Sequence, residues 1–241
     1  MTGPDLDPHY RRWNQDDIVD RFAGKSAGDF FDSETRLLKP IASTIKSVID
    51  IGCASGRFVE LLTTLGATPR YTGLDLSEAS VARARALYPA HDFHCVNALT
   101  FEPENTADLV NATGVMQHEP RFDDLLSRMI SWSRRHVLFD VKLASMPNHL
   151  ADIDRAYIAS DPPMYFVVLS AQQFLQEISE RRDISRAEFF GYATPRNAKA
   201  VLPTRMGELV SAGVLLEIGT PPAGGPEILS SLPAFLMNNS E

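Results

Sequence analysis

The fold is decided by the run DIGCASG at residues 50–56. This run closes a β-branched segment, residues 47–52, and apolar residues at helical spacing follow it until Gly66. Glycine at positions 52 and 56 lets the backbone turn tightly and lets a ligand lie against it. The free N–H groups at the start of the helix point at the same place. The stretch therefore predicts a strand, a ligand-binding turn and a helix in immediate succession.

Strands and helices alternate with short connections beyond this run. The predicted strands are apolar through most of their length, which is typical of parallel strands that helices cover on both faces. We therefore predict a doubly wound, Rossmann-like α/β fold with a seven-stranded, mostly parallel sheet and N-terminal cap helices. The expected strands lie at residues 47–52, 71–75, 93–96, 108–112 and 136–143, with helices that start near Gly56, Ser77 and Phe122.

The C-terminal part is predicted to add the last two strands. Ser170 and Gln173 form a capping box at the start of a further helix. A sixth strand is expected at residues 186–192. For the seventh strand, residues 214–218 are the first choice and residues 200–202 are the rival.

The alternation divides the chain into four parts. Residues 1–46 are expected to form an N-terminal cap, because they precede the first strand and carry aromatic and acidic side chains. Residues 47–143 are expected to form the Rossmann-like core, and residues 144–170 an insertion or lid. Residues 171–241 are expected to complete the same sheet.

The composition excludes several classes of protein. The chain has 241 residues, 44% of them hydrophobic, and a formal net charge of -8, which fits one folded domain. An acidic chain without a lysine- or arginine-rich run repels phosphate backbones, so no nucleic-acid partner is expected. No apolar stretch approaches the ~20 residues that span a bilayer, so no membrane partner is expected. Cys53 and Cys95 form no disulfide framework, and the expected location is cytoplasmic.

Two carboxylates flank the expected ligand site. Asp75 ends the second strand, where a carboxylate can accept hydrogen bonds from both hydroxyls of a ribose. Asp50 places a negative charge beside the turn, which favours the ammonium and sulfonium groups of a cationic ligand and disfavours a pyrophosphate. This charge separates the site from a dinucleotide site. No residues have the spacing of metal ligands, so no metal is expected.

Four segments resemble the motifs of class I S-adenosylmethionine-dependent methyltransferases. DIGCASG at residues 50–56 is similar to their first motif, D-x-G-x-G-x-G, and GLDLS at residues 73–77 is similar to their second-strand motif. Residues 97–99 occupy the place after strand three where the family often has an Asp-Ala pair beside the adenine. Residues 108–118 resemble the strand-four motif, D-x-V followed by a histidine-containing turn. The resemblance covers about residues 47–143.

The resemblance implies S-adenosyl-L-methionine as the cofactor and a small-molecule methyl acceptor as the partner. Two residues depart from the family pattern. Ala54 replaces the middle glycine, a mild change where the local φ is negative. Asn97 replaces the common aspartate, so the adenine amino group meets an amide oxygen or only backbone. The residues expected to bind the cofactor are Asp50, Gly52, Cys53, Ala54, Gly56, Asp75, Leu76, Asn97, Ala98, Thr113 and Trp13.

His118 follows the fourth strand and is the candidate catalytic residue. With an ordinary pKa of about 6.5 it is a base for a hydroxyl acceptor. The alternative is a solvated turn histidine or one bonded to the next helix. Tyr10 and Trp13 either line the cofactor pocket or pack a cap helix onto the core. Asp140 and Lys142 alternate with apolar neighbours near the end of the fifth strand, so that either one of them faces the active-site crevice or, as we expect, the two form an exposed pair.

The predicted function is transfer of a methyl group to an oxygen or nitrogen of a small or medium-sized organic acceptor. One alternative is a non-catalytic protein of the same fold that works through a partner. The other is an NAD-dependent oxidoreductase, whose first turn would carry G-x-G-x-x-G where this chain has G-x-x-x-G. The acceptor's identity and the oligomeric state are left open.

Overall fold

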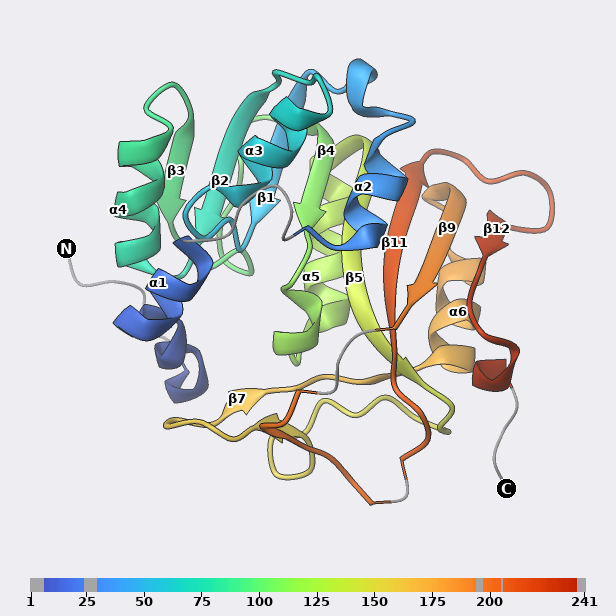
Figure 1. The fold of residues 1–241 in the computed structure, drawn as a ribbon. Helices are drawn as coiled ribbons and strands as arrows, with labels where there is room; N and C mark the ends of the chain where they lie inside the picture. The colour runs from blue at the N-terminus through green and yellow to red at the C-terminus, as the bar shows by residue number, and fades with distance from the viewer. Residues whose placement is uncertain (1–6, 24–29, 194–196, 205, 238–241) are drawn as a thin grey trace.

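The computed structural model describes residues 7–23, 30–193, 197–204 and 206–237, and one mixed sheet of nine strands organises it (Figure 1). Eight strands stand in the order β12-β9-β11-β5-β4-β1-β2-β3, and β8 pairs with β5. β11 is antiparallel to β5 and β9, and the other pairs are parallel. The strands are β1 (Ser47–Ile51), β2 (Arg70–Asp75), β3 (Asp92–Cys95), β4 (Ala107–Ala112), β5 (Ser133–Ala144), β8 (Leu169–Ser170), β9 (Ile184–Tyr192), β11 (Val210–Ile218) and β12 (Glu227–Ser230).

The α/β class and the mostly parallel sheet are confirmed, but the prediction of seven strands is wrong. β8 has only two residues, and β12 is an edge strand whose four residues are mostly exposed, so neither carries a recognisable apolar run. The first choice for the seventh strand is confirmed, because residues 214–218 lie in β11. The rival segment forms β10 (Ala200–Val201), which belongs to another sheet.

Helices cover both faces of the large sheet (Figure 1). Two helix starts are N-capped: the Ser77 hydroxyl accepts a hydrogen bond from the Ser80 N–H, and the Ser170 hydroxyl accepts one from the Gln173 N–H. The predicted capping box at Ser170 is incomplete, because the Ser170 N–H donates to the His149 Nδ1 and not to the Gln173 side chain. One face carries α2 (Asp32–Leu38), α3 (Arg57–Thr64) and α4 (Glu78–Leu87), and the other carries α5 (Phe122–Trp132) and α6 (Ala171–Glu180).

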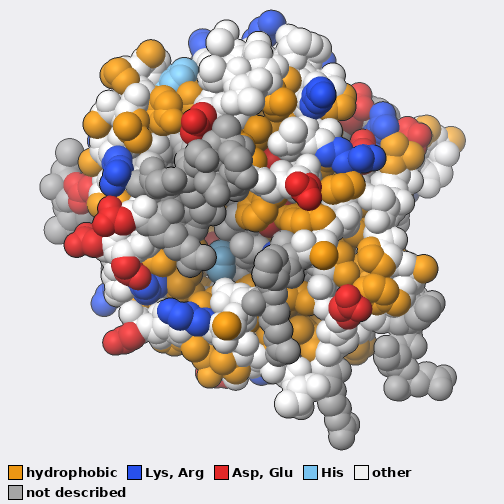
Figure 2. Space-filling model, viewed as in Figure 1, with side chains coloured by type: hydrophobic (Ala, Val, Ile, Leu, Met, Phe, Trp, Pro, Cys, Tyr) orange, Lys and Arg blue, Asp and Glu red, His pale blue; other side chains and the backbone are white. Residues whose placement is uncertain are grey.

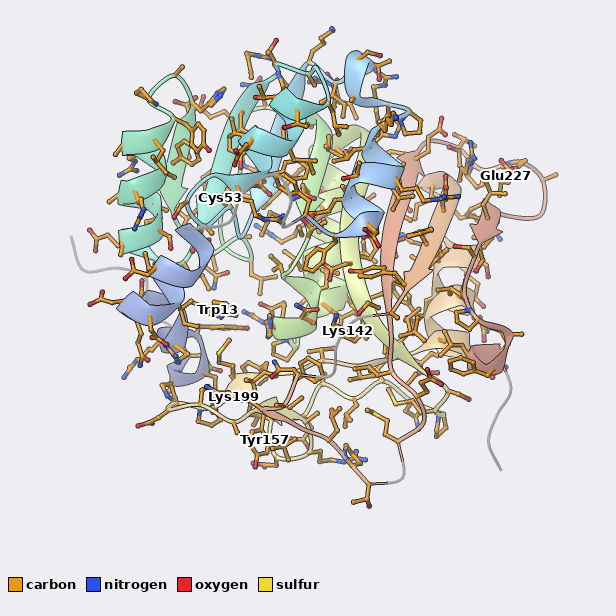
Figure 3. All side chains as sticks on the ribbon, viewed as in Figure 1. Trp13, Cys53, Lys142, Tyr157, Lys199 and Glu227 are labelled. Carbon is orange, nitrogen blue, oxygen red and sulfur yellow. The ribbon has the colours of Figure 1, made fainter. Side chains whose placement is uncertain are left out.

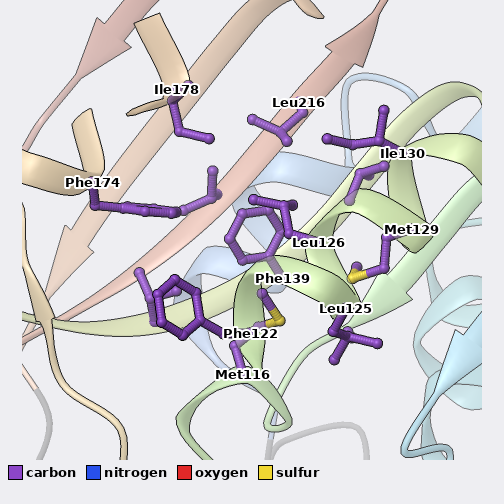
Figure 4. Close-up of a cluster of buried hydrophobic side chains, with 14 of the residues drawn as sticks. Met116, Phe122, Leu125, Leu126, Met129, Ile130, Phe139, Phe174, Ile178 and Leu216 are labelled. Carbon is purple, nitrogen blue, oxygen red and sulfur yellow. The ribbon is translucent and has the colours of Figure 1, made fainter. Parts of the chain in front are cut away.

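The core beneath α5 and α6 is the larger of the two apolar layers. Figure 4 shows Phe139 of β5 and Leu216 of β11 packed against Leu126 and Phe174 from the two helices. All of these side chains are buried. Both sheet faces are thus apolar over most of their area, which agrees with the continuous hydrophobic runs in the strands.

The strand alternation brings polar side chains to the face that α2 and α3 cover. In β1, Val48 packs in the core under α3, whereas Ile49 packs in the core under α5. Asp50 follows Val48 on the first face. It pairs in register with Asn111 of β4. Because β1 lies between β2 and β4, the strand order reverses at β1, and ligands of such sheets bind beside the reversal at the carboxyl ends of the strands.

A smaller layer lies across these carboxyl ends (Figure 1). Its core contains Ile158, Met164 and Phe166, with Trp13 and Met206 packed against them. The layer is formed by a three-stranded sheet of β6 (Tyr157–Ile158), β7 (Met164–Tyr165) and β10, and by the N-terminal η1 (Pro8–Asn14), which is followed by α1 (Asp16–Ala23). The short 3-10 helices elsewhere are η3 (Ala42–Thr44), η4 (Met116–His118) and η5 (Ala234–Met237).

The remaining features of the fold are the N-terminal cap, the character of the helices and the charges on one face. Of the predicted N-terminal cap, residues 1–6 and 24–29 lie outside the described residues. None of the helices in the described ranges is long and apolar enough to cross a membrane. On the described part of the face in Figure 2, Lys and Arg side chains are interspersed with Asp and Glu.

Candidate functional site

The carboxyl ends of β1, β2, β4 and β5 open into a cavity of about 1140 Å³. Small-molecule sites usually have about 300–1,000 Å³, so this cavity has room for more than one small ligand. The wall that we call the motif end consists of cavity residues from 50–58, 74–76, 96–99 and 111–115. The wall that we call the cover end consists of those from 10–18, 117–119, 158–166, 197–204 and 206–209.

Gly52 and Ala54 form the turn at the motif end, and both have left-handed backbone. Gly52 has a φ of +69°, and the Gly52 N–H donates to the Leu74 carbonyl at 2.7 Å. Ala54 has a φ of +47°, so the condition under which its replacement of glycine was expected to be mild is not met. A left-handed residue other than glycine costs about 1–2 kcal/mol, which the surrounding contacts must offset.

Asp75 supplies part of that compensation. Its Oδ2 accepts a hydrogen bond from the Ala54 N–H at 2.8 Å, and its Oδ1 accepts one from the Ser77 N–H at 2.8 Å. Burial raises the pKa of this carboxyl, and the backbone donors oppose the rise. Asp75 therefore ties the turn after β1 to the end of β2 while it lines the cavity.

Asp50 lies at the centre of a buried hydrogen-bond network. Its Oδ1 accepts from the Asn111 Nδ2 at 2.7 Å, and its other oxygen accepts from the Tyr71 hydroxyl. The Asn111 Nδ2 also donates to the Thr113 Oγ1 at 3.2 Å. The Thr113 hydroxyl in turn donates to the Glu34 Oε1 at 2.7 Å. Burial raises the pKa of Asp50 to about 7, against the opposing effect of the two donors.

The ion pair between Glu34 and Arg57 was not predicted. The Arg57 Nη2 lies 2.7 Å from the Glu34 Oε1, and its Nη1 lies 3.1 Å from the Oε2. Glu34 is fully buried in α2 and also accepts the Phe31 N–H at 2.8 Å. Arg57 lines the cavity directly after the motif. Its place directly after the motif could have indicated that Arg57 lies at the site. The place of Glu34 could not be predicted in this way, because it depends on how α2 packs on the sheet.

Of the other residues predicted to bind the cofactor, Asn97 lines the cavity and Gly56 does not. The Asn97 Oδ1 accepts the Leu99 N–H at 2.9 Å, so this amide oxygen is already engaged in a local turn. Gly56 precedes α3 with a φ of +88°, and a Cβ there would lie 2.6 Å from the Tyr88 ring, so close packing requires glycine. The predicted residues that the structure brings to the cavity wall are Trp13, Asp50, Gly52, Cys53, Ala54, Asp75, Leu76, Asn97, Ala98, Thr113 and His118.

His118 lies in η4 at the cover end. Its Nδ1 lies 2.8 Å from the Tyr165 carbonyl oxygen, which can only accept, so Nδ1 carries the proton. The Nε2 lone pair faces the Gln117 amide nitrogen at 3.4 Å. Burial lowers the His118 pKa from its usual value of 6.5 to about 4. The imidazole is therefore neutral near pH 7, and the expectation of an ordinary pKa is wrong.

Trp13 and Tyr10 come from η1 and contact the same turn. The Trp13 and His118 rings meet edge to face, with centroids 5.0 Å apart. The Tyr10 hydroxyl donates to the Glu119 Oε2 at 2.9 Å, and both residues are buried. Trp13 therefore lies at the cover end, where Figure 3 shows it beside the central space.

The expected exposed pair on β5 is wrong. Asp140 is 0% exposed and accepts a hydrogen bond from the Gly114 N–H. Lys142 lines the cavity between its two ends, and its Nζ donates to the Ser211 Oγ at 2.6 Å. Burial lowers the pKa of Lys142, and Asp140 opposes this shift. Period-two alternation placed both side chains on one face but could not show that α2 and the cover enclose that face.

These features define an α/β protein with a ligand cavity at the strand-order reversal. Through the described ranges, no group of His, Cys, Asp or Glu residues could hold a metal ion. The cavity brings a glycine-containing turn, buried carboxylates, a neutral histidine and a lysine together. Such an arrangement can bind a small polar ligand at one end and present a base to a second ligand at the other.

Comparison with known proteins shows similarity to methyltransferases. Residues 49–134 match the family model described as a methyltransferase domain. The chain is 33% identical over 118 residues to a trans-aconitate 2-methyltransferase of Methylobacterium radiotolerans, covering 47% of this chain and 44% of that protein. It is 30% identical over 99 residues to the Escherichia coli enzyme of the same name, covering 41% and 39%. The chain thus matches less than half the length of these curated relatives.

Solved structures share the fold. The N-terminal domain of EvdMO1 with SAH and D-fucose has a TM-score of 0.60 at 12% identity, covering 79% of this chain and 84% of that one. The N-methyltransferase NodS of Bradyrhizobium japonicum with S-adenosyl-L-homocysteine has a TM-score of 0.55 at 15% identity, covering 88% and 99%. Residues 49–134 thus match a methyltransferase domain, and most of the chain shares its fold with structures of S-adenosylmethionine-dependent methyltransferases. The family resemblance of the four motifs is thereby confirmed.

Proposed function

We propose that this protein transfers the methyl group of S-adenosylmethionine to an oxygen or nitrogen atom of a small or medium-sized organic acceptor. The observation that carries the proposal is that one cavity joins the motif end to the His118 turn. A donor and an acceptor can therefore meet inside a single enclosed space. We assign the donor to the motif end and the acceptor to the cover end.

The residues of the motif end fit a cationic donor. Gly52 is exposed in the cavity wall, so the backbone is bare where a ligand would lie. Asp75 lines the same wall and retains acceptor capacity beyond its two backbone donors, which suits ribose hydroxyls. Asp50 and Glu34 add carboxyl groups against the single guanidinium of Arg57, so the local charge favours a cation.

When bound, S-adenosylmethionine supplies a methyl group that its sulfonium already activates. The chain's own task is to hold the acceptor in line with that group, an effect worth up to roughly 7–11 kcal/mol in ideal cases. For a hydroxyl acceptor, His118 takes the proton at Nε2, because Nδ1–H is held by the Tyr165 carbonyl. Trp13 and the cover shield this step from water.

The acceptor class rests on the cover end and on the relatives. The wall there carries apolar and aromatic groups, including Trp13, Met164 and Phe166, around a few polar ones. Such a lining suits a small organic molecule better than a polymer. The relatives are trans-aconitate 2-methyltransferases, so trans-aconitate is the first acceptor to assay.

Calorimetry with S-adenosylmethionine, S-adenosylhomocysteine and NAD tests the donor assignment. We expect the first two to bind with one site and NAD not to bind. NAD binding alone would support an oxidoreductase. Methyl transfer from labelled S-adenosylmethionine to trans-aconitate and to a panel of small alcohols and amines then tests catalysis. Donor binding without transfer to any of them would favour a non-catalytic protein.

A further inference from the structure

We propose that Lys142 binds an anionic group of the methyl acceptor, a carboxylate or a phosphate, and thereby selects acceptors that are organic anions. This inference rests on the proposed methyl transfer and specifies the acceptor class for it. Lys142 lies on the cavity wall between the motif end and the cover end. Figure 3 shows it near the central space, with Trp13 and Lys199 on other sides.

The ammonium of Lys142 has a hydrogen bond to the protein but no ion pair with the residues that the structure describes. A lysine has three N–H donors, and its hydrogen-bond partner here is the neutral Ser211 hydroxyl at 2.6 Å. Among the ion pairs of the described residues, none involves Lys142. Asp140 lies two positions away on the same strand face; its Oδ1 accepts the Gly114 N–H, and its Oδ2 has no hydrogen-bond partner in the described ranges and makes no ion pair with Lys142. Two donors of Lys142 therefore remain for the cavity.

The other enclosed charges of the wall are already matched. Arg57 pairs with Glu34 through two hydrogen bonds. Arg12 pairs with Asp17 at the cavity edge. The acidic side chains follow the same rule: Asp50 accepts from Tyr71 and Asn111, Asp75 from two backbone N–H groups, and Glu119 from Tyr10 and the Arg121 N–H.

The two charged wall residues without such matching, Lys199 and Glu208, are exposed at the cavity mouth. Water screens charges there, whereas Lys142 is largely enclosed. Asp140 offsets part of the cost of enclosing this ammonium but forms no ion pair with it, and an anionic ligand in direct contact removes more of that cost. Among the described residues of the cavity wall, Lys142 is thus the enclosed cation that has room for a ligand as its direct ion-pair partner.

The position of Lys142 also suits the proposed reaction. β4 and β5 are neighbours, so the turn with His118 after β4 and Lys142 near the end of β5 face the same space. The charge of Lys142 is one of the influences that lower the His118 pKa, after burial. An anion bound at Lys142 therefore places the rest of the acceptor beside His118.

Titration calorimetry of the protein loaded with S-adenosylhomocysteine tests this inference. The carboxylate probes are succinate and citrate, the phosphate probes are glycerol 3-phosphate and inorganic phosphate, and dimethyl succinate is the neutral control. The variants are Lys142→Met, Lys142→Arg and, as a charge control on the surface, Lys39→Met. Binding of S-adenosylhomocysteine to each variant reports that it is folded.

We expect at least one probe anion to bind the wild type and to bind Lys142→Met about 10- to 100-fold more weakly. Lys142→Arg should restore most of the affinity, and Lys39→Met should change it less than twofold. The probe set that binds distinguishes a carboxylate from a phosphate. Equal affinity in Lys142→Met, or no binding of either set, would overturn the proposal. Failure of S-adenosylhomocysteine to bind the wild type would contradict the proposed function instead, and the unloaded protein would then be titrated to test Lys142.

Discussion

The motif end and the cover end of the cavity are built in different ways. At the motif end, Gly52, Ala54 and Asp75 are fixed by hydrogen bonds between two adjacent strands and the turn that follows β1. At the cover end, Tyr10 reaches Glu119 across 109 positions of sequence, and Tyr165 reaches His118 across 47. The first wall is therefore local to one strand–turn–helix unit, and the second depends on three distant segments.

This difference suits the two walls to different tasks. A wall set by the sheet's own turns is rigid, because the strands and their ladders determine the turn. A wall assembled from loops can change without disturbing the sheet. The donor assignment rests on the motif end, which the sheet's turns hold, and the acceptor assignment rests on the cover end, which is assembled from loops. Four variants test whether the two walls have these separate tasks.

The largest effect is expected for His118→Ala. If His118 takes the acceptor's proton, turnover should fall by roughly 10²–10⁴-fold, while the affinity for S-adenosylmethionine stays nearly unchanged. Single-turnover rates and calorimetry measure the two quantities. Wild-type turnover in the variant would show that alignment alone drives the transfer, as with an acceptor that carries no proton.

The pH profile gives an independent readout of the same residue. Burial lowers the His118 pKa to about 4, so the base is neutral from about pH 5 upward. We expect that protonation of His118 does not reduce turnover between pH 6 and 8, and that turnover falls as the pH decreases toward 4. An ionisation near 6.5 that disappears in His118→Ala would contradict the enclosed geometry of this imidazole.

Gly52→Ala should be the next largest change and should act at the motif end. The added Cβ would lie 2.4 Å from the Val115 Cγ2, and φ is +69°. Strain of about 1–2 kcal/mol and overpacking of about 1–3 kcal/mol should together lower the free energy of unfolding, and the distorted turn should lose donor binding. Urea unfolding and calorimetry measure these effects.

Gly66→Ala is the matched control for that variant. Gly66 has a similar φ of +76°, but no atom lies within 4 Å of the added Cβ. It should show the backbone strain alone and keep full donor affinity. If both variants bind S-adenosylmethionine like the wild type, the turn at Gly52 is not the donor site.

Asp75→Ala should have a smaller effect at the same wall. We expect S-adenosylmethionine to bind about 1–3 kcal/mol more weakly, because a charged acceptor for the ribose hydroxyls is lost. The Ala54 and Ser77 N–H groups also lose their acceptor, so the free energy of unfolding should fall as well. Asp92→Ala removes an exposed carboxylate from β3 and should change neither quantity. Unchanged affinity in a folded Asp75→Ala protein would exclude the assigned ribose contact.

The sequence predicted the parts of the molecule that local pattern determines. The core strands, two capped helix starts and the residues around Gly52 and Asp75 all follow from periodicity and turn chemistry within short windows. The two-residue β8 is too short to show such a pattern, and β12 is a mostly exposed edge strand without an apolar run, so both were missed. Gly56 shows the limit of a motif, because its glycine serves packing against Tyr88 and not the cavity wall.

The errors at the site have a common physical cause. Alternation on β5 places Asp140 and Lys142 on one face, but whether that face is covered depends on α2 and on the segment from residue 197. The same packing of α2 joins Glu34 to Arg57 over 23 positions. Tertiary packing thus decides burial, and burial decides the pKa of His118 and Lys142.

The smallest expected effect belongs to Tyr10→Phe, which tests how the cover end is attached. The variant leaves the buried Glu119 Oε2 without its Tyr10 donor, so the free energy of unfolding should fall by about 1–2 kcal/mol. Tyr165→Phe removes a similar 2.9 Å bond to the exposed Asp7 and should cost less than about 0.5 kcal/mol. Urea unfolding compares the two, and calorimetry should show unchanged donor affinity in both. Equal costs would mean that Tyr10 does not anchor η1, and a loss of donor affinity in Tyr10→Phe would mean that the two ends share one task.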